Sequence, residues 1–216
     1  MNKGWRQSIR RSMIVSSVSI LAVAGCAGEG GLDDSSPPTS SPGTSAPSTT
    51  DVLVEFNPTL HDELIAMMER DQAGRKGGTD TEGDPARTER LKEIIDEFGW
   101  PTFDLVGEDG EDAAWVIAQH SDLDPEFQSG AVEILRDAVA AGQASPGNLA
   151  YLEDRVLAGK GEPQIYGTQI GCGPDGPEPA TPITDEDTVD ARRAEAGLEP
   201  LADYMGELAE ICQGDM

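Results

Sequence analysis

Apolar side chains between residues 57 and 211 recur every three or four positions, the spacing that gathers them on one face of an α-helix. The first two predicted helices each carry four such residues: Leu60, Leu64, Met67 and Met68 in the first, and Leu91, Ile94, Ile95 and Phe98 in the second. No stretch alternates apolar and polar residues convincingly with the period of two that a half-buried strand requires. The pattern therefore predicts an all-α fold.

Four of the predicted helices begin with a residue that carries a side-chain oxygen, followed by proline. These pairs are Asn57-Pro58, Asp84-Pro85, Asp124-Pro125 and Ser145-Pro146. The oxygen can accept a hydrogen bond from the first free backbone N–H groups, and proline at the first helical position removes no donor that the helix uses. Gly99 is expected to end the second helix.

The remaining boundaries follow the same periodicity. Further helices are predicted at residues 111–120, 125–141, 146–158, 188–196 and 200–211. The first of these is almost entirely apolar from Ala113 to Ala118, which predicts a central position. A long loop rich in glycine and proline spans residues 159–187. The expected architecture is an irregular bundle of six or seven helices with no internal repeat.

Residues 1–25 have the order of a secretory signal peptide. Lys3, Arg6, Arg10 and Arg11 precede an uncharged apolar run from Met13 to Ala24. The run is about half the roughly 20 residues that a membrane-spanning helix needs. We expect a plain basic signal, with twin-arginine export through Arg10-Arg11 as the alternative route.

The apolar run ends in Leu21-Ala22-Val23-Ala24-Gly25-Cys26, which resembles the lipobox of bacterial lipoproteins. The resemblance implies that Cys26 is lipidated and becomes the mature N-terminus, because its thiolate is the nucleophile that takes the diacylglycerol. Two acyl chains would then hold the protein on the extracytoplasmic side of the cell membrane. The alternative is an ordinary signal peptide with a chance cysteine.

Residues 26–50 are rich in Gly, Ser, Pro and Thr and contain almost no large apolar side chain. Ordering such a segment would cost conformational entropy without burying apolar surface, so it is predicted to be a disordered linker. Residues 51–216 are long enough to form one domain with its own core.

The chain is strongly acidic, with a formal net charge of −26 at pH 7. Nucleic acids and anionic lipid surfaces both attract basic proteins, so neither is an expected electrostatic partner. The acidic stretches at residues 108–112 and 185–190 lack the ligand spacing of a calcium loop and are expected to be solvated faces.

Two cysteines remain after lipidation, Cys172 and Cys212. In an oxidising compartment they are expected to form a disulfide. The alternative, a metal pair, has no Cys-x-x-Cys motif or nearby histidine to supply further ligands. With only His61 and His120, a site with several histidines cannot be built, so we expect no metal and no cofactor.

Gln119 and His120 end the apolar central helix and are the first candidates for chemistry. Helical spacing places His120 after Ala113, Val116 and Ile117, so its ring should be at least partly buried. A neutral imidazole can act as a base when a carboxylate or a carbonyl orients it. Alternatively, His120 only satisfies the end of its helix.

Asp154 and Arg155 lie in a largely apolar helix, with Arg155 one turn from Tyr151. A semi-buried arginine needs an anionic partner, which either the protein or a substrate can supply.

The loop at residues 164–169 carries Gln164, Tyr166, Thr168 and Gln169 around Gly167. These groups could form the rim of a site for a polar ligand or satisfy the backbone of their own loop.

Several segments occur in a characteristic order: 99–101 with 106–107, 113–120 with Asp122, Asp124, Phe127 and Gln128, 148–156, 163–169, and 189–193 with 197–201. This order resembles a bacterial family known only as domain of unknown function 6624, over nearly all of residues 51–208. The resemblance brings no established activity, and the cysteine-bearing insertion at residues 171–182 departs from the family pattern. These segments add Gln128, Arg192 and Arg193 to the candidate polar cluster.

The sequence contains no Gly-x-Ser-x-Gly, no His-Glu-x-x-His, no phosphate-binding glycine loop and no dinucleotide fingerprint. The leading hypothesis is therefore a module that binds a peptide, a glycan or an envelope protein. A second hypothesis is a hydrolase-like enzyme in which His120 is the base and Arg155, Tyr166 and Gln169 position the substrate. Convergence of these four side chains on one pocket would favour the enzyme. A third hypothesis is a structural envelope protein.

Overall fold

The structure is a computed structural model that describes residues 54–214. The predicted signal peptide and the predicted linker, which begins at Cys26, lie outside the described residues. So do the first three residues of the predicted domain, 51–53.

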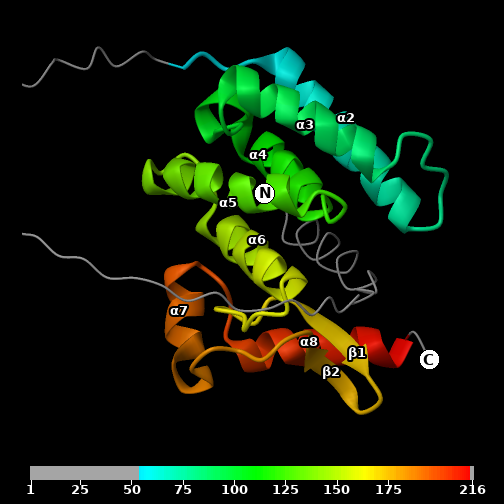
Figure 1. The fold of residues 1–216 in the computed structure, drawn as a ribbon, viewed down its shortest axis with the longest axis vertical. Helices are drawn as coiled ribbons and strands as arrows, with labels where there is room; N and C mark the ends of the chain where they lie inside the picture. The colour runs from blue at the N-terminus through cyan, green and yellow to red at the C-terminus, as the bar shows by residue number, and fades with distance from the viewer. Residues whose placement is uncertain (1–53, 215–216) are drawn as a thin grey trace, which may run out of the picture. The chain divides into compact units, whose positions relative to one another are not determined.

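Seven α-helices account for most of the described residues (Figure 1). They are α2 (Pro58–Arg75), α3 (Asp84–Phe98), α4 (Phe103–Gln119), α5 (Pro125–Ala140), α6 (Pro146–Gly159), α7 (Val189–Glu195) and α8 (Leu201–Gly214). A short 3-10 helix, η1 (Glu186–Thr188), precedes α7. The predicted all-α class and helix number are confirmed. No helix within residues 54–214 is long and apolar enough to cross a membrane.

Three of the four predicted helix caps are confirmed. Asn57 accepts a hydrogen bond from the backbone N–H of Leu60 at 3.1 Å, Asp124 from that of Phe127 at 3.0 Å, and Ser145 from that of Asn148 at 3.3 Å.

The predicted cap at Asp84 is wrong. Asp84 is the first residue of α3, and Gly83 takes the cap position without a side-chain hydrogen bond. The Asp84 carboxylate instead accepts hydrogen bonds from Arg75 at 2.9 Å and Arg87 at 2.6 Å. Two arginines thus outcompete the backbone for this side chain, because a charge-assisted hydrogen bond is stronger than one to a neutral amide.

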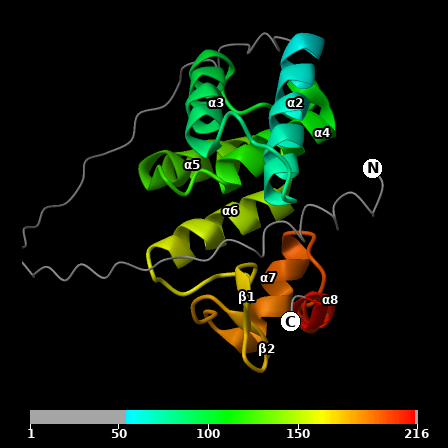
Figure 2. The same ribbon diagram turned by 90° about the vertical axis from the view of Figure 1, so that its right-hand side faces the viewer.

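Helix α4 forms the centre of the domain, as its apolar sequence predicts. It packs against α2, α3, α5 and α6, and the side chains from Ala113 to Ala118 are all buried. It begins at Phe103, earlier than the predicted residue 111, but Gly107 interrupts it with φ +76°, a conformation that side-chain-bearing residues rarely adopt. Figures 1 and 2 show α2 and α3 at one end of the domain and α7 and α8 at the other.

The long loop after α6 contains a β-hairpin that the periodicity analysis missed. Strands β1 (Ile170–Gly173) and β2 (Gly176–Pro179) pair antiparallel, with Ile170 opposite Pro179 and Gly173 opposite Gly176. Each strand has only four residues, and glycine and proline fill most of them. A period of two cannot be detected in so short and atypical a segment.

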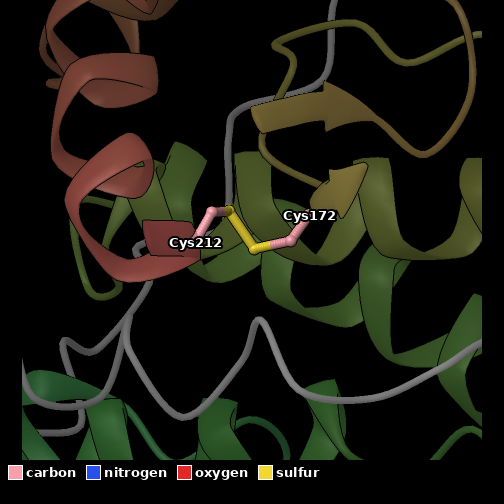
Figure 3. Close-up of a disulfide and its surroundings, with 2 residues drawn as sticks. All are labelled: Cys172 and Cys212. Carbon is pink, nitrogen blue, oxygen red and sulfur yellow. A yellow bond between two sulfur atoms is a disulfide. The ribbon is translucent and has the colours of Figure 1, made fainter. Parts of the chain in front are cut away.

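The hairpin is covalently attached to the last helix. Cys172 of β1 and Cys212 of α8 form the predicted disulfide, with their Cα atoms 5.5 Å apart (Figure 3). The bond closes a loop of 40 residues that includes η1 and α7. It therefore holds together the end of the domain that has the least regular backbone.

Candidate functional site

Asp154 of α6 organises the loop at residues 164–169. Its carboxylate is fully buried and accepts hydrogen bonds from the backbone N–H groups of Ile165 at 2.6 Å and Thr168 at 2.9 Å. It also accepts the hydroxyl of Thr168 at 3.0 Å. Burial raises the pKa of Asp154, while these hydrogen bonds act in the opposite direction. Asp154 and Thr168 thus support the loop from inside.

Three further candidates hold the same loop through its carbonyl groups. Gln164 donates to the carbonyl of Gln169 at 3.0 Å. Arg192 donates to the carbonyl of Ile165 at 2.8 Å, and Arg193 to that of Tyr166 at 2.8 Å. Gln164, Arg192 and Arg193 therefore satisfy backbone groups of the loop.

Asp122 brings together a second group of candidates. It accepts hydrogen bonds from Arg155 Nε at 2.9 Å and from Gln128 Nε2 at 3.3 Å. Arg155 Nη1 also donates to Gln169 Oε1 at 3.2 Å. Burial would raise the pKa of Asp122, but the hydrogen bond and charge of Arg155 outweigh it and lower this pKa. Gln119, nearby on α4, donates to the carbonyl of Tyr151.

His120 faces a different set of partners, on α2. Its Nδ1 atom lies 2.9 Å from Asp71 Oδ2 and 3.1 Å from Arg75 Nε. Nδ1 can donate to the carboxylate in one tautomer or accept from the guanidinium in the other. The ring is 5 % exposed, so the predicted burial is confirmed, and this burial lowers the pKa of His120 despite the neighbouring carboxylate.

A network of charges surrounds this histidine. Arg87 is almost fully buried and donates to Asp80 at 2.8 Å and to Asp84 at 2.6 Å. Burial alone would raise the pKa of Asp71, but hydrogen bonds with His120 and Arg75 lower it to about 2. Asp71 follows Leu64, Met67 and Met68 on the same helical face, a spacing that could have revealed it as a buried acid.

The four side chains of the enzyme hypothesis do not share one set of contacts. Arg155 donates a hydrogen bond to Gln169, whereas His120 is hydrogen-bonded to Asp71.

Tyr166 has a raised pKa of about 12, because its phenol is buried and lies near the carboxyl group of Glu153.

The structure contains a cavity of about 300 Å³ that none of the sequence-predicted candidates lines. It lies between α4, the start of α6 and the turn after α7. Its lining comprises Asp112, Trp115, Ser145, Pro146, Gly147, Asn148, Tyr151, Ala194, Glu195, Ala196, Gly197 and Leu198.

Two neighbouring acids of α4 are buried next to this cavity: Asp112 lines it, and Glu111, the preceding residue, does not. Glu111 is fully buried and accepts hydrogen bonds from Trp100 Nε1 at 3.2 Å and Asn148 Nδ2 at 2.9 Å. Asn148 Nδ2 also donates to Asp112 Oδ1 at 2.7 Å. Burial, followed by the negative charge of Asp112, raises the pKa of Glu111 to about 8.

Residues 108–112 were expected to be a solvated acidic face, and for two of them this expectation is wrong. Glu108 and Asp109 are exposed, but Glu111 and Asp112 are buried. The signal lay next to them, because α4 is apolar on every face from Ala113 to Ala118, and Glu111 and Asp112 directly precede this buried segment on the same helix. The stretch at residues 185–190 is exposed apart from Val189.

Aromatic rings form another wall of the cavity. Trp115 and Tyr151 meet edge to face with ring centroids 5.8 Å apart. Trp115 is 5 % exposed, and its Nε1 donor is buried without a hydrogen-bond partner in the described part of the chain. Within residues 54–214, no group of three or more His, Cys, Asp or Glu side chains could hold a metal ion.

The model of a family of unknown function, DUF6624, matches residues 58–214. No curated protein and no solved structure matches the chain. The match runs from the first residue of α2 to the last residue of α8, so it includes the cavity, the Asp154-supported loop and the His120 network. The chain therefore belongs to the family of unknown function DUF6624.

Proposed function

We propose that this chain is a ligand-binding module held outside the cell by a lipid on Cys26, and that its ligand occupies the cavity between α4, α6 and the turn after α7. The cavity is the observation that carries this proposal. It is concave and combines aromatic walls with a few polar groups, the usual composition of small-ligand sites. Its volume of about 300 Å³ suits one small molecule.

The cavity is built on elements that hold its shape. Trp115 and Asp112 lie on the central helix, and Asn148 and Tyr151 lie on the first two turns of α6. Side chains on packed helices are positioned more precisely than those on loops. A preformed site of this kind binds its ligand without a large ordering cost.

The disulfide supports the proposed location outside the cytoplasm. The Cys172–Cys212 disulfide suits an oxidising compartment, because cytosolic thiols are usually kept reduced. A module anchored through Cys26 would meet ligands near the membrane.

The anchor is tested by replacing Cys26. We expect Cys26→Ser to move the protein from the membrane fraction to the soluble extracytoplasmic fraction, because the acyl chains would be lost. Mass spectrometry of the native protein should show a diacylated N-terminus at Cys26. Native protein that begins at Met1, or that carries no acyl chain, would contradict the lipid anchor.

The cavity is tested by site-specific photo-crosslinking in the native envelope. A photo-reactive amino acid is introduced at Ala194, an exposed residue of the cavity rim, and in a matched variant at Asp137, an exposed residue of α5. We expect a discrete mass adduct at position 194 that is absent at position 137. The same adducts at both positions, or none at position 194, would remove the cavity as the binding site.

A second candidate function, acid–base catalysis, is favoured by the pair formed by Asp71 and His120. Asp71 orients the ring through Nδ1 at 2.9 Å, while His120 Nε2 makes no hydrogen bond within residues 54–214. Burial lowers the pKa of His120 and favours the neutral ring, the form that accepts a proton. A panel of ester, amide and glycoside substrates tests it: activity that His120→Gln abolishes would support catalysis, and an inactive wild type would argue against it.

A further inference from the structure

The charged side chains that line the cavity are both acidic. They are Asp112 on α4 and Glu195 at the end of α7, and no lysine, arginine or histidine of residues 54–214 lines it. Asp112 is only 3 % exposed, so its carboxylate belongs to the inner wall, whereas Glu195 lies at the exposed rim. A site with this lining attracts positive charge and repels anions.

The neighbouring acid adds to this asymmetry. Glu111 is held by the neutral donors Trp100 and Asn148, and the negative charge of Asp112 helps to raise the pKa of Glu111. A cation in the cavity would reduce the repulsion between these two carboxyl groups.

The two helix ends at the cavity also differ. The last turn of α7 reaches it through Ala194, Glu195 and Ala196, and the negative end of a helix dipole favours cations. The carbonyls of Arg192, Arg193 and Ala194 themselves already accept backbone N–H groups of the following turn, so only this dipole acts on a ligand. The amide end of α6 reaches it as well, but Pro146 has no N–H and Ser145 Oγ already accepts the N–H of Asn148. The α6 terminus therefore offers few donors to an anion.

Trp115 supplies a second, independent indication of a ligand. Its Nε1 donor is buried without a partner in the described residues, and buried donors are rarely left in that state. Its ring and that of Tyr151 form the aromatic wall, and aromatic faces attract ammonium groups. A ligand with both a positive charge and an acceptor oxygen would be attracted by the charge of Asp112 and would supply the acceptor for Trp115 Nε1.

The spacing of these two residues limits how far apart the ligand's two groups lie. Asp112 and Trp115 are three residues apart on α4, so their side chains are neighbours on the helix surface, with Cβ atoms about 5–6 Å apart. A ligand small enough for the cavity can therefore reach both residues, and an ammonium group and an oxygen a few bonds apart suit this spacing.

We infer that the cavity binds a small 1,2-amino alcohol in its protonated form, with the ammonium group at Asp112 and the neighbouring oxygen accepting from Trp115 Nε1. This inference rests on the proposed function and names its ligand class. Ethanolamine and glucosamine are the simplest probes of the class. Their N-acetyl derivatives keep the oxygen but lose the charge, which makes them matched controls.

The test uses the full lipidated chain in detergent, with tryptophan labelled by ¹⁵N and the Trp115 indole resonance assigned through Trp115→Phe. We expect at least one ammonium probe to shift the Trp115 resonance saturably at millimolar concentration, while its N-acetyl control leaves the resonance in place. Asp112→Asn should weaken binding at least tenfold, and Asp137→Asn, on the exposed surface of α5, should leave it unchanged.

The Trp100 indole, which donates to Glu111, reports whether each variant is folded. If Asp112→Asn does not fold, Glu195→Gln replaces it, and a two- to threefold weakening is expected from this exposed rim charge. Equal binding of the N-acetyl controls, or no shift of Trp115 by either ammonium probe, would overturn the inference. If the crosslink at position 194 persists in that case, only the ligand class is wrong; if it is also absent, the proposed function fails with it.

Discussion

Two buried polar clusters lie near the two ends of the apolar segment of α4. The buried acids in these clusters have different kinds of hydrogen-bond partner. At the C-terminal end, His120 meets Asp71, which also contacts Arg75. At the other end, Glu111 meets the neutral donors Trp100 and Asn148 and contacts no basic side chain within residues 54–214.

The pKa values record the difference. Asp71 is buried, yet its hydrogen bonds with His120 and Arg75 lower its pKa to about 2. Glu111 is also buried, and without such a partner its pKa rises to about 8. The paired cluster ties α2 to α3 and α4, whereas the acid with the raised pKa stands beside the cavity. Of these two buried acids, only Glu111, which has no basic partner within residues 54–214, lies next to a residue that lines the cavity, Asp112.

Breaking the paired cluster should have the largest effect. Arg87→Met removes a cation that contacts Asp80 and Asp84 and lies 3.6 Å from Asp71. Arg87 and Asp71 are buried, whereas Asp80 and Asp84 are only partly covered. Removing one partner of a buried ion pair costs about 3–5 kcal/mol. The free energy of unfolding, measured by urea titration at pH 7, should fall by that amount. A loss below about 1 kcal/mol would show that the cluster contributes little to stability.

Glu111→Gln tests the comparison through the pH dependence of the free energy of unfolding. Since the folded pKa of Glu111, about 8, lies above its ordinary value of 4.5, the wild type keeps the full stability contribution of this group below about pH 4.5 and loses it as the pH rises through 8. The glutamine variant does not titrate. Relative to wild type, it should gain on the order of 3 kcal/mol between pH 5 and pH 9. Urea titrations at both pH values measure this, and a constant difference would contradict the raised pKa.

His120→Gln should show a smaller effect with the opposite pH trend. The folded pKa of His120 is lowered, so below pH 6.5 the unfolded chain binds a proton that the folded chain does not, and wild-type stability rises with pH in that window. The variant loses this rise and, at pH 7.5, about 1–2 kcal/mol from the lost hydrogen bond to Asp71. Thermal unfolding from pH 5 to 7.5 tests both, and an unchanged pH trend would place the titration elsewhere.

The smallest effect is expected at an exposed cluster, which serves as the reference for the others. Arg136 of α5 contacts Glu133 and Glu153 but is 45 % exposed. Exposed ion pairs contribute about 0–1 kcal/mol, and less at high salt. Arg136→Met should therefore change the free energy of unfolding by less than 1 kcal/mol. A loss as large as that of Arg87→Met would mean that burial does not separate the two clusters.

Much of the helical framework could be predicted because its signals are local. Asn57, Asp124 and Ser145 each cap the helix that follows them. Each side chain accepts a hydrogen bond from the backbone N–H three residues later. Asp84 broke the rule because Arg75 at the end of α2 and Arg87, one turn along α3, both donate to its carboxylate. The hairpin of β1 and β2 was not predicted, because strands of four residues are too short to display a period of two.

The candidate residues were found by type, but their partners were not. Asp154, Arg155 and Gln169 are placed as a support for one loop, while the cavity is lined by other residues. Signal peptide, lipidation and partner remain predictions, since Cys26 lies outside the described residues.

The sequence by itself determined the helices, the cysteine pair and the acidic character, because periodicity, capping and composition act over a few residues or over the chain as a whole. Only the tertiary structure decided which buried acid meets an arginine and which meets a neutral amide. Asp71 and His120 are 49 residues apart, and Glu111 and Asn148 are 37 apart. Protonation depends on such neighbours and on burial, and both exist only once the chain has folded.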